Sequence, residues 1–297
     1  MSTKRVQLVN RAKSHAMYGV CVGFGVLIVA LLALVTAYIL YRGIGGLLTH
    51  DTAGAVSGIN WGFFTQLPTG DSKNPGGMPH AIVGTIYLLG MASAVGIPMG
   101  VLAGIYLSEY RGEGWLINSV RFIADVLAGV PSIVVGILGY ELVVRPIGNT
   151  NGYAGALAMA FIMIPIVART TEEMLRLVPQ SFREGSLALG ATKSQTILRV
   201  VLPAASGSVV TGIMLALARI AGETAPLLFT VGASRFMPGN PGESYPSLMV
   251  TIYRYTAGTL EEKELAWSGI LALIVLVFVL NLAIRAVTAR SMALRFR

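Results

Sequence analysis

A chain of 297 residues in which 54% are hydrophobic and only 12% are charged has too few polar side chains to cover a soluble globular domain. Its mean hydropathy of +0.70 indicates an integral membrane protein. The formal net charge of +8 would suit a nucleic-acid partner, but 15 of the 22 Lys and Arg residues lie in the segments 1–16, 108–121, 169–203 and 285–297, beside apolar runs. We therefore interpret the surplus as a signal for membrane orientation.

Six apolar stretches approach or exceed the length of about 20 residues that a helix needs to cross a bilayer. Lipid offers no partners to backbone N–H and C=O groups, so each stretch should be helical. Pro98, Pro131 and Pro165 fall inside three of them and should kink or break those helices. We expect an all-α integral membrane protein with six transmembrane helices, over approximately residues 17–41, 81–107, 120–140, 153–168, 205–231 and 266–284.

The basic residues predict the topology. Four Lys and Arg residues precede the first span without an intervening acid, and four arginines close the chain in the same way. The positive-inside rule then places both termini in the cytoplasm, which requires an even number of spans. We expect a cytoplasmic tail over 1–16, a six-helix transmembrane domain over 17–284 that includes a cytoplasmic segment over 169–203, and a cytoplasmic tail over 285–297.

Little chemistry is visible in the segments that join the spans. Cys21 is the single cysteine and lies in the first span, and residues 42–79 form a turn-rich loop. Residues 246–257 predict a short re-entrant or interfacial helix, with Tyr253 and Tyr255 at headgroup level. The chain has no phosphate-binding glycine loop and no histidine at ligand spacing, so we expect neither ATP nor a metal to bind to it.

Two ionisable residues, Arg219 and Glu223, lie in the interior of the fifth span. A charge at the bilayer centre costs about 2.5–3.5 kcal/mol on insertion scales. The two are four residues apart and would share one helix face, where they could neutralise each other and hold the bundle together. Alternatively, Arg219 offers a planar fork that suits an oxyanion, and Glu223 holds Arg219 between substrates or accepts a proton.

Further charges lie at the cytoplasmic ends of two other spans. Arg169 ends the fourth span and is either a second cation on the same pathway or an anchor at the membrane edge. Arg121 and Asp125 repeat the four-residue spacing, and for them we favour a structural ion pair.

Residues 184–203 form a polar segment, rich in small side chains, between two long apolar runs. Glu184 is expected at the N-terminal end of a short helix, where the helix dipole favours an acid. Gly190 suits a helix C-terminus or tight turn, and Pro203 suits the start of the next helix. Because its small residues would let another protein's groove close over it, the segment predicts a partner-binding cytoplasmic hairpin.

This segment resembles the coupling loop of ABC importer permeases, whose pattern is E-A-A-x3-G-x9-I-x-L-P. Val200 stands in the Ile position, and Gly185 and Ser186 replace the two alanines with other small residues. Four positions match in register: Glu184, Gly190, Leu202 and Pro203. Residues 167–179 and 217–230 are similar, more specifically, to PstA-type permeases of phosphate importers.

The resemblance implies a type I ABC importer permease fold in the bacterial plasma (inner) membrane. The chain would be a transmembrane subunit of an ATP-driven importer of inorganic phosphate and would itself hydrolyse nothing. Its implied partners are a PstC-type permease, a PstB-type ATPase dimer that binds ATP and Mg, and a PstS-type phosphate-binding protein. Arg219, Glu223 and Arg169 would lie on the phosphate route. The ATPase-coupling residues would be Glu184, Gly185, Ser186, Leu187, Gly190, Ala191, Leu202 and Pro203.

Two alternatives stay open at this stage. One arginine can serve any tetrahedral oxyanion, so the substrate could be sulfate, molybdate or phosphonate. A secondary carrier or channel would work without an ATPase and often shows inverted repeats, but no self-similar halves are visible here. A scaffold without transport would leave the cost of burying Arg219 and Glu223 unexplained.

Overall fold

The structure, a computed structural model, describes residues 3–50, 56–71, 75–110 and 114–295. Within these ranges the regular secondary structure is helical apart from one antiparallel hairpin of β1 (Leu48–His50) and β2 (Val56–Ile59). The helices are α1 (Thr3–Leu47), α2 (Gly62–Thr65), α3 (Pro79–Glu109), α4 (Trp115–Gly129), α5 (Ser132–Gly139), η1 (Tyr140–Val144), α6 (Arg145–Ile147), α7 (Gly152–Arg176), α8 (Gln180–Ala188), α9 (Lys193–Thr196), η2 (Ile197–Val201), α10 (Leu202–Ala221), α11 (Ala225–Thr230), α12 (Leu248–Thr256) and α13 (Leu260–Arg295).

Five of the described helices are long and apolar enough to cross a membrane, and a bent pair makes a sixth if it counts as one span. The pair is Ile117–Gly129 and Ser132–Ile147, which meet at 102°. With this pair counted as one span, the expected six spans and their order are confirmed. Pro131 lies at the bend, as predicted, whereas α3 and α7 continue as helices past Pro98 and Pro165.

The fifth expected span, 205–231, is wrong as a single helix. The helix begins at Lys193 and ends at Ala221, and α11 starts only at Ala225. Pro226 lies in the first turn of α11 and has no N–H to continue the helical ladder of α10. Pro203 is the second residue of α10, as expected, although the turns of α9 and η2 lead into α10 without a break.

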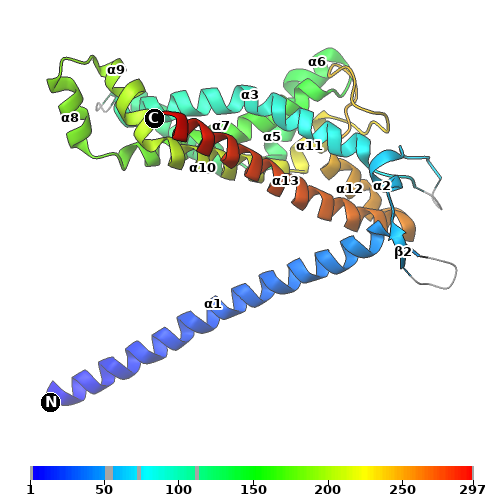
Figure 1. Cartoon of the computed structure of the whole chain (residues 1–297), viewed down its shortest axis with the longest axis horizontal. Coiled ribbons are helices and arrows are strands. Elements are labelled where there is room, and N and C mark those ends of the chain that lie inside the picture. The colour runs from blue at the N-terminus through cyan, green and yellow to red at the C-terminus, as the bar shows by residue number, and fades with distance from the viewer. Residues whose placement is uncertain (1–2, 51–55, 72–74, 111–113, 296–297) are drawn as a thin grey trace.

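The body of the molecule is built on close contact between α3 and α7 (Figure 1). Gly96, Gly100 and Gly104 form a row on α3 that faces α7. A Cβ atom at Gly100 would lie 2.6 Å from Cβ of Val167, and one at Gly104 would lie 2.5 Å from Cβ of Thr171. Small residues at four-residue spacing let two membrane helices approach closely, so this row sets the distance between α3 and α7.

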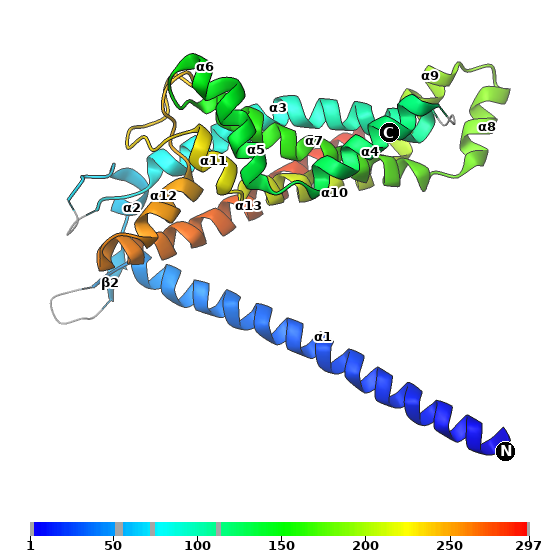
Figure 2. The ribbon, with the colours of Figure 1, turned by 180° about the vertical axis from the view of Figure 1, so that it is seen from behind.

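The body has two distinct ends (Figures 1 and 2). α8 and α9 form what we call the hairpin end, and the strands with α2 lie at the far end. α3 follows α2 at the far end, and α7 is followed by α8 at the hairpin end. Both helices therefore run from the far end towards the hairpin end. α12 confirms the short helix expected over 246–257.

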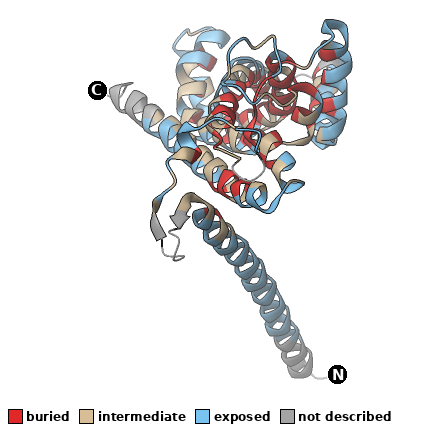
Figure 3. Cartoon of the chain, turned by 90° about the vertical axis from the view of Figure 1, so that its right-hand side faces the viewer, coloured by how far each residue is buried: buried red, intermediate tan, exposed pale blue. Residues whose placement is uncertain are grey.

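α1 stands away from the body over most of its length, and the side chains that the structure describes there are exposed (Figure 3). It touches α13 near the far end, where the rings of Tyr38 and Trp267 meet edge to face with centroids 5.2 Å apart. An apolar helix left exposed in this way requires lipid or another subunit around it.

Candidate functional site

A cavity of about 180 Å³ lies halfway along the body, where two broken spans meet. Its wall includes residues 127–132, where α4 gives way to α5, and Ile162 and Ile166 near the middle of α7. The break after α10 lies at the same level, since Arg219 and Glu223 also line this cavity. We call it the mid-depth cavity. Irregular backbone is tolerated at membrane depth where it lines such a cavity.

Arg219 and Glu223 do not share a helix face, contrary to the prediction from their spacing. α10 ends at Ala221, and Glu223 lies in the break that follows, with its N–H donating to the carbonyl of Ile220 at 3.1 Å. Among the described residues no ion pair joins Arg219 to Glu223, and both line the same cavity. Their side chains therefore remain available to a ligand there.

Two helix termini favour charge in the mid-depth cavity. Arg219 lies in the last turn of α10, where the negative end of the helix dipole stabilises a cation. α5 begins at Ser132, which is part of the cavity wall, and its positive end favours an anion. A guanidinium and a helix N-terminus at one cavity can bind a tetrahedral oxyanion.

Arg169 belongs to a neighbouring group of ionic side chains rather than to the cavity wall. The buried carboxylate of Glu172 accepts hydrogen bonds from Arg121 Nη2 at 3.0 Å, from Arg169 Nη1 at 2.9 Å, and from Arg176. Arg169 also pairs with Asp125. These five residues, which we call the charge cluster, carry three positive and two negative charges.

The charge cluster corrects the expected pairing of Arg121 with Asp125. Both lie on α4, but each pairs with a residue of α7, so they join two helices instead of bracing one. The sequence analysis did not single out Glu172. Its position three residues after Arg169 and four before Arg176 was the available signal.

The charge cluster lies next to the mid-depth cavity, on the side nearer the hairpin end. Arg169 follows the cavity residue Ile166 by one helical turn on α7. Asp125 precedes the cavity residue Leu127 on α4, on the side of α4 that begins nearer the hairpin end. The side chains of Arg121 and Arg169 are each 32% exposed, so an anion leaving the cavity along α4 and α7 would meet them.

The hairpin expected over 184–203 is confirmed as two helical segments with a turn between them. Gly190 has φ +84°, a left-handed conformation that favours glycine, and its N–H donates to the carbonyl of Leu187. The second segment starts with a capping box between Thr192 and Gln195. Glu184 was expected at a helix N-terminus, but it lies in the middle of α8, which already begins at Gln180.

The structure divides the predicted coupling residues into an exposed tip and a packed base. Glu184, Gly185, Leu187 and Gly190 are exposed, while Ser186 and Ala191 are half-buried. Leu202 and Pro203 are half-buried at the base of the hairpin. The tip also exposes large apolar side chains, among them Phe182, Leu187, Leu189 and Leu198, with Leu189 at 90% exposure. Exposed apolar groups of this size indicate a contact surface for another protein or for lipid.

Arg183, which the sequence analysis missed, joins the hairpin to the body. Its guanidinium donates to both carboxylate oxygens of Glu109 at the end of α3, at 2.6 and 3.1 Å. It also donates to the carbonyls of Leu175 at 2.9 Å and Val178 at 2.7 Å, where α7 ends. No sequence spacing could indicate a pair of residues 74 positions apart.

The sequence that forms the broken spans and the hairpin matches a known family. A family model described as the binding-protein-dependent transport system inner membrane component matches residues 96–292. The chain belongs to this family. The matched range contains the mid-depth cavity, the charge cluster and the hairpin.

Curated relatives confirm the resemblance to PstA-type permeases. The chain is 41% identical over 237 residues to the phosphate transport system permease protein PstA of Yersinia pestis, covering 80% of each chain. It is also 41% identical over 230 residues to PstA 1 of Mycobacterium tuberculosis (strain CDC 1551 / Oshkosh), covering 75% of this chain and 73% of the relative.

Solved structures support the fold. An inward-facing crystal form of the MetNI methionine ABC transporter aligns with a TM-score of 0.54 and 20% identity, over 72% of this chain and 93% of the other. A bacterial ABC transporter involved in the import of the acidic polysaccharide alginate aligns with a TM-score of 0.56 and 17% identity, over 89% and 95%. The chain thus has the fold of ABC importer permeases.

Proposed function

We propose that this chain is a transmembrane subunit of an ATP-driven importer of inorganic phosphate. The observation that carries the proposal is the placement of Arg219 and Glu223, without a mutual ion pair, in a cavity at mid-depth of the body. Relatives named as phosphate transport permeases favour phosphate over sulfate, molybdate or phosphonate. Phosphate is partly protonated near neutral pH, so Glu223 can accept a hydrogen bond or a proton from it, which fully ionised sulfate cannot supply.

In this proposal phosphate passes from the mid-depth cavity to the charge cluster. Arg219 holds the anion at the cavity, and the α5 N-terminus adds N–H groups to it. Arg169 then receives the anion on the side nearer the hairpin, in exchange for part of its contacts with Asp125 and Glu172. Because Glu172 keeps the guanidinium groups in place, the second position stays ordered when it is empty.

The proposal includes partners that fit the exposed surfaces. α4 exposes apolar residues beside its charged ones, among them Phe122, Ile123 and Val126, and a PstC-type permease would cover them and complete the pathway. The hairpin tip would dock on a PstB-type ATPase dimer, which binds ATP and Mg, so hydrolysis takes place outside this chain. A PstS-type protein would deliver phosphate at the far end.

Orientation in the bacterial inner membrane is also part of the proposal. α1 begins and α13 ends on the side of the body where the hairpin lies (Figure 1). The basic residues near both termini favour the cytoplasm, and the hairpin must meet a cytoplasmic ATPase. One topology, with both termini and the hairpin in the cytoplasm, satisfies these requirements together.

The decisive experiment measures uptake by the assembled complex in vesicles. We expect Arg219→Gln to abolish phosphate uptake while the complex still assembles, and Arg285→Gln, on the exposed surface of α13, to leave uptake unchanged. Uptake should require ATP, and sulfate or molybdate should not compete with phosphate. Normal uptake by Arg219→Gln would overturn the role of the cavity, and uptake without nucleotide would favour a secondary carrier.

A further inference from the structure

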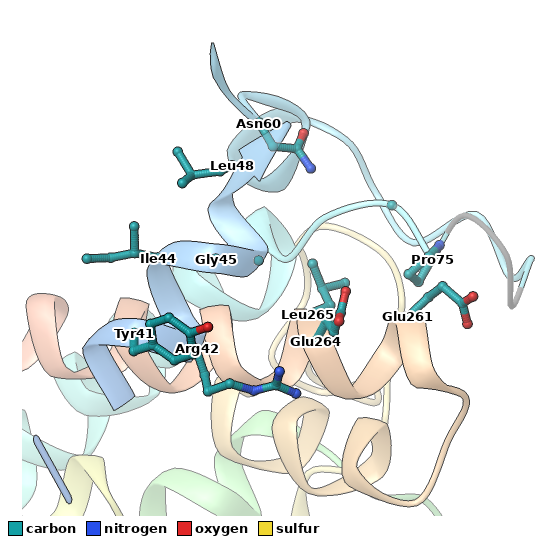
Figure 4. A pocket seen from close by; sticks show the side chains of 12 residues that line it. Tyr41, Arg42, Ile44, Gly45, Leu48, Asn60, Pro75, Glu261, Glu264 and Leu265 are labelled. Atoms are coloured by element: carbon teal, nitrogen blue, oxygen red, sulfur yellow. The ribbon is translucent and has the colours of Figure 1, made fainter. Parts of the chain in front are cut away.

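A second cavity, of about 710 Å³, lies at the far end of the body, between the end of α1 and the start of α13. Its lining includes Arg42 from α1, Asn60 after β2, and Glu261 and Glu264 from the first turns of α13 (Figure 4). None of these residues belongs to the mid-depth cavity, the charge cluster or the hairpin. The proposed transport function therefore leaves this cavity without a role.

The charged groups of this cavity are not paired with one another. Nε of Arg42 is buried and has no hydrogen-bond partner. No ion pair involves Arg42, Glu261 or Glu264 in the part of the chain that the structure describes. Figure 4 shows the Arg42 side chain extending from α1 towards α13, where Glu264 lies. A buried donor without a partner is unfavourable, so a ligand that accepts its hydrogen bond would be stabilised there.

The cavity lies where a membrane helix leaves the apolar layer. The apolar run of α1 ends directly before Arg42, and the apolar part of α13 begins after Glu264. Tyr38 and Trp267 meet just inside this level, and aromatic side chains are typical of the membrane–water interface. A ligand in the cavity would therefore occupy the depth of lipid headgroups.

Close helix contact sets the distance across the cavity. A Cβ atom at Gly43 would lie 2.7 Å from Cβ of Leu271, and Ser268 Oγ donates to the carbonyl of Gly43 at 3.2 Å. Gly46 is equally constrained, because its Cβ would lie 2.3 Å from Ser268 Oγ. The α1 side, which carries Arg42, and the α13 side, which carries Glu261 and Glu264, are thus held at a set distance by helix packing.

One guanidinium and two carboxylates select a ligand that carries both signs of charge. A free phosphate would be attracted by Arg42 but repelled by Glu261 and Glu264, and a simple cation would face the reverse conflict. A phosphodiester joined to a primary ammonium satisfies both. The exposed apolar side of α1, which includes Leu40 and Ile44, offers a surface for acyl chains beside the cavity.

We propose that this cavity binds the headgroup of a phosphatidylethanolamine-type phospholipid, with the phosphodiester on Arg42 and the ammonium on Glu261 and Glu264. Such a lipid would fill the gap between α1 and the body at its far end. It would also hold α1, which contacts the body mainly through α13, in a defined direction.

The test uses the full chain in its assembled complex, with retained lipid measured by native mass spectrometry. The wild type should retain phosphatidylethanolamine at least about tenfold better than phosphatidylglycerol, which has the phosphodiester but no ammonium. Arg42→Gln should lose retention of both, and Glu264→Gln should lose the preference between them. Arg145→Gln, at the same end but exposed and paired with Glu141, is the matched control and should behave as the wild type.

Other outcomes would overturn the proposal. If the wild type retains the two lipids equally, or if Arg42→Gln retains them as well as the wild type does, the cavity does not recognise the lipid headgroup. Complete displacement of the lipid by soluble phosphoethanolamine would assign the site to a free zwitterion. If Arg42→Gln does not assemble, Arg42→Lys, which keeps the charge, and Glu264→Gln decide, since the first should retain the lipid and the second should lose its preference.

Discussion

Arg183 of α8 and Glu109 at the end of α3 form a two-point ion pair in which the side chains are only 14% and 6% exposed. Because Arg183 also binds two carbonyls where α7 ends, one side chain ties the hairpin to both central helices. α3 and α7 are themselves packed through the Gly96–Gly100–Gly104 row. The hairpin is therefore attached directly to α7, which carries part of the mid-depth cavity.

Removal of Arg183 alone should be more harmful than removal of the pair. Arg183→Gln leaves Glu109 buried without its partner, and loss of one member of a buried ion pair costs about 3–5 kcal/mol. The double variant Arg183→Gln with Glu109→Gln leaves no buried charge and should recover most of that stability. Thermal unfolding of the purified complex measures both, and additive losses from the two single variants would contradict a direct coupling.

The double variant should also separate the effect of this ion pair on stability from its effect on transport. If the pair carries motion from the hairpin to the body, the double variant assembles and hydrolyses ATP but imports less phosphate per ATP. Uptake and ATP hydrolysis measured in the same vesicles give this ratio. An unchanged ratio in the double variant would show that Arg183 and Glu109 contribute to stability alone.

Glu172 should be essential to the order of the charge cluster. Glu172→Gln removes the carboxylate that three arginines share, and we expect a loss of a few kcal/mol in stability together with reduced phosphate uptake. Glu173→Gln is the matched control, because its side chain is exposed and adjacent in sequence. Equal effects of the two substitutions on the unfolding temperature would rule out a special role for Glu172.

Gly190 should be sensitive to alanine for a backbone reason alone. A Cβ atom would meet nothing within 4 Å at either Gly190 or Gly185, but Gly190 has φ +84° and Gly185 lies within α8. Gly190→Ala should cost about 1–2 kcal/mol through the left-handed conformation and lower ATP-coupled uptake. Gly185→Ala should be neutral or slightly stabilising. Similar uptake by both variants would show that the turn geometry does not matter for coupling.

The contact between α3 and α7 should tolerate no added atom at its centre. At Gly100 a new Cβ would clash with Val167, whereas at Gly90, on the same helix, nothing lies within 4 Å. Gly100→Ala should therefore lower the unfolding temperature by several degrees, from about 1–3 kcal/mol of overpacking, and Gly90→Ala should not. A stable Gly100→Ala complex would mean that α3 and α7 separate more easily than their packing indicates.

The amino-acid sequence by itself determined that the chain lies in a membrane, the number and order of the spans, the bend at Pro131 and the turn at Gly190. These features depend on local properties: the length of an apolar run, a missing N–H, or a backbone angle that glycine readily adopts. The family resemblance likewise rests on residues that are close together in the chain.

Only the tertiary structure decided which charges meet. Spacing predicted that Arg121 would pair with Asp125 and that Arg219 and Glu223 would share a face, yet the first two reach across to α7 and the last two are separated by a helix break. Arg183 and Glu109 meet because α8 folds back against the end of α3. An ion pair depends on the distance between atoms in space, and residues on different helices acquire that distance only when the helices pack.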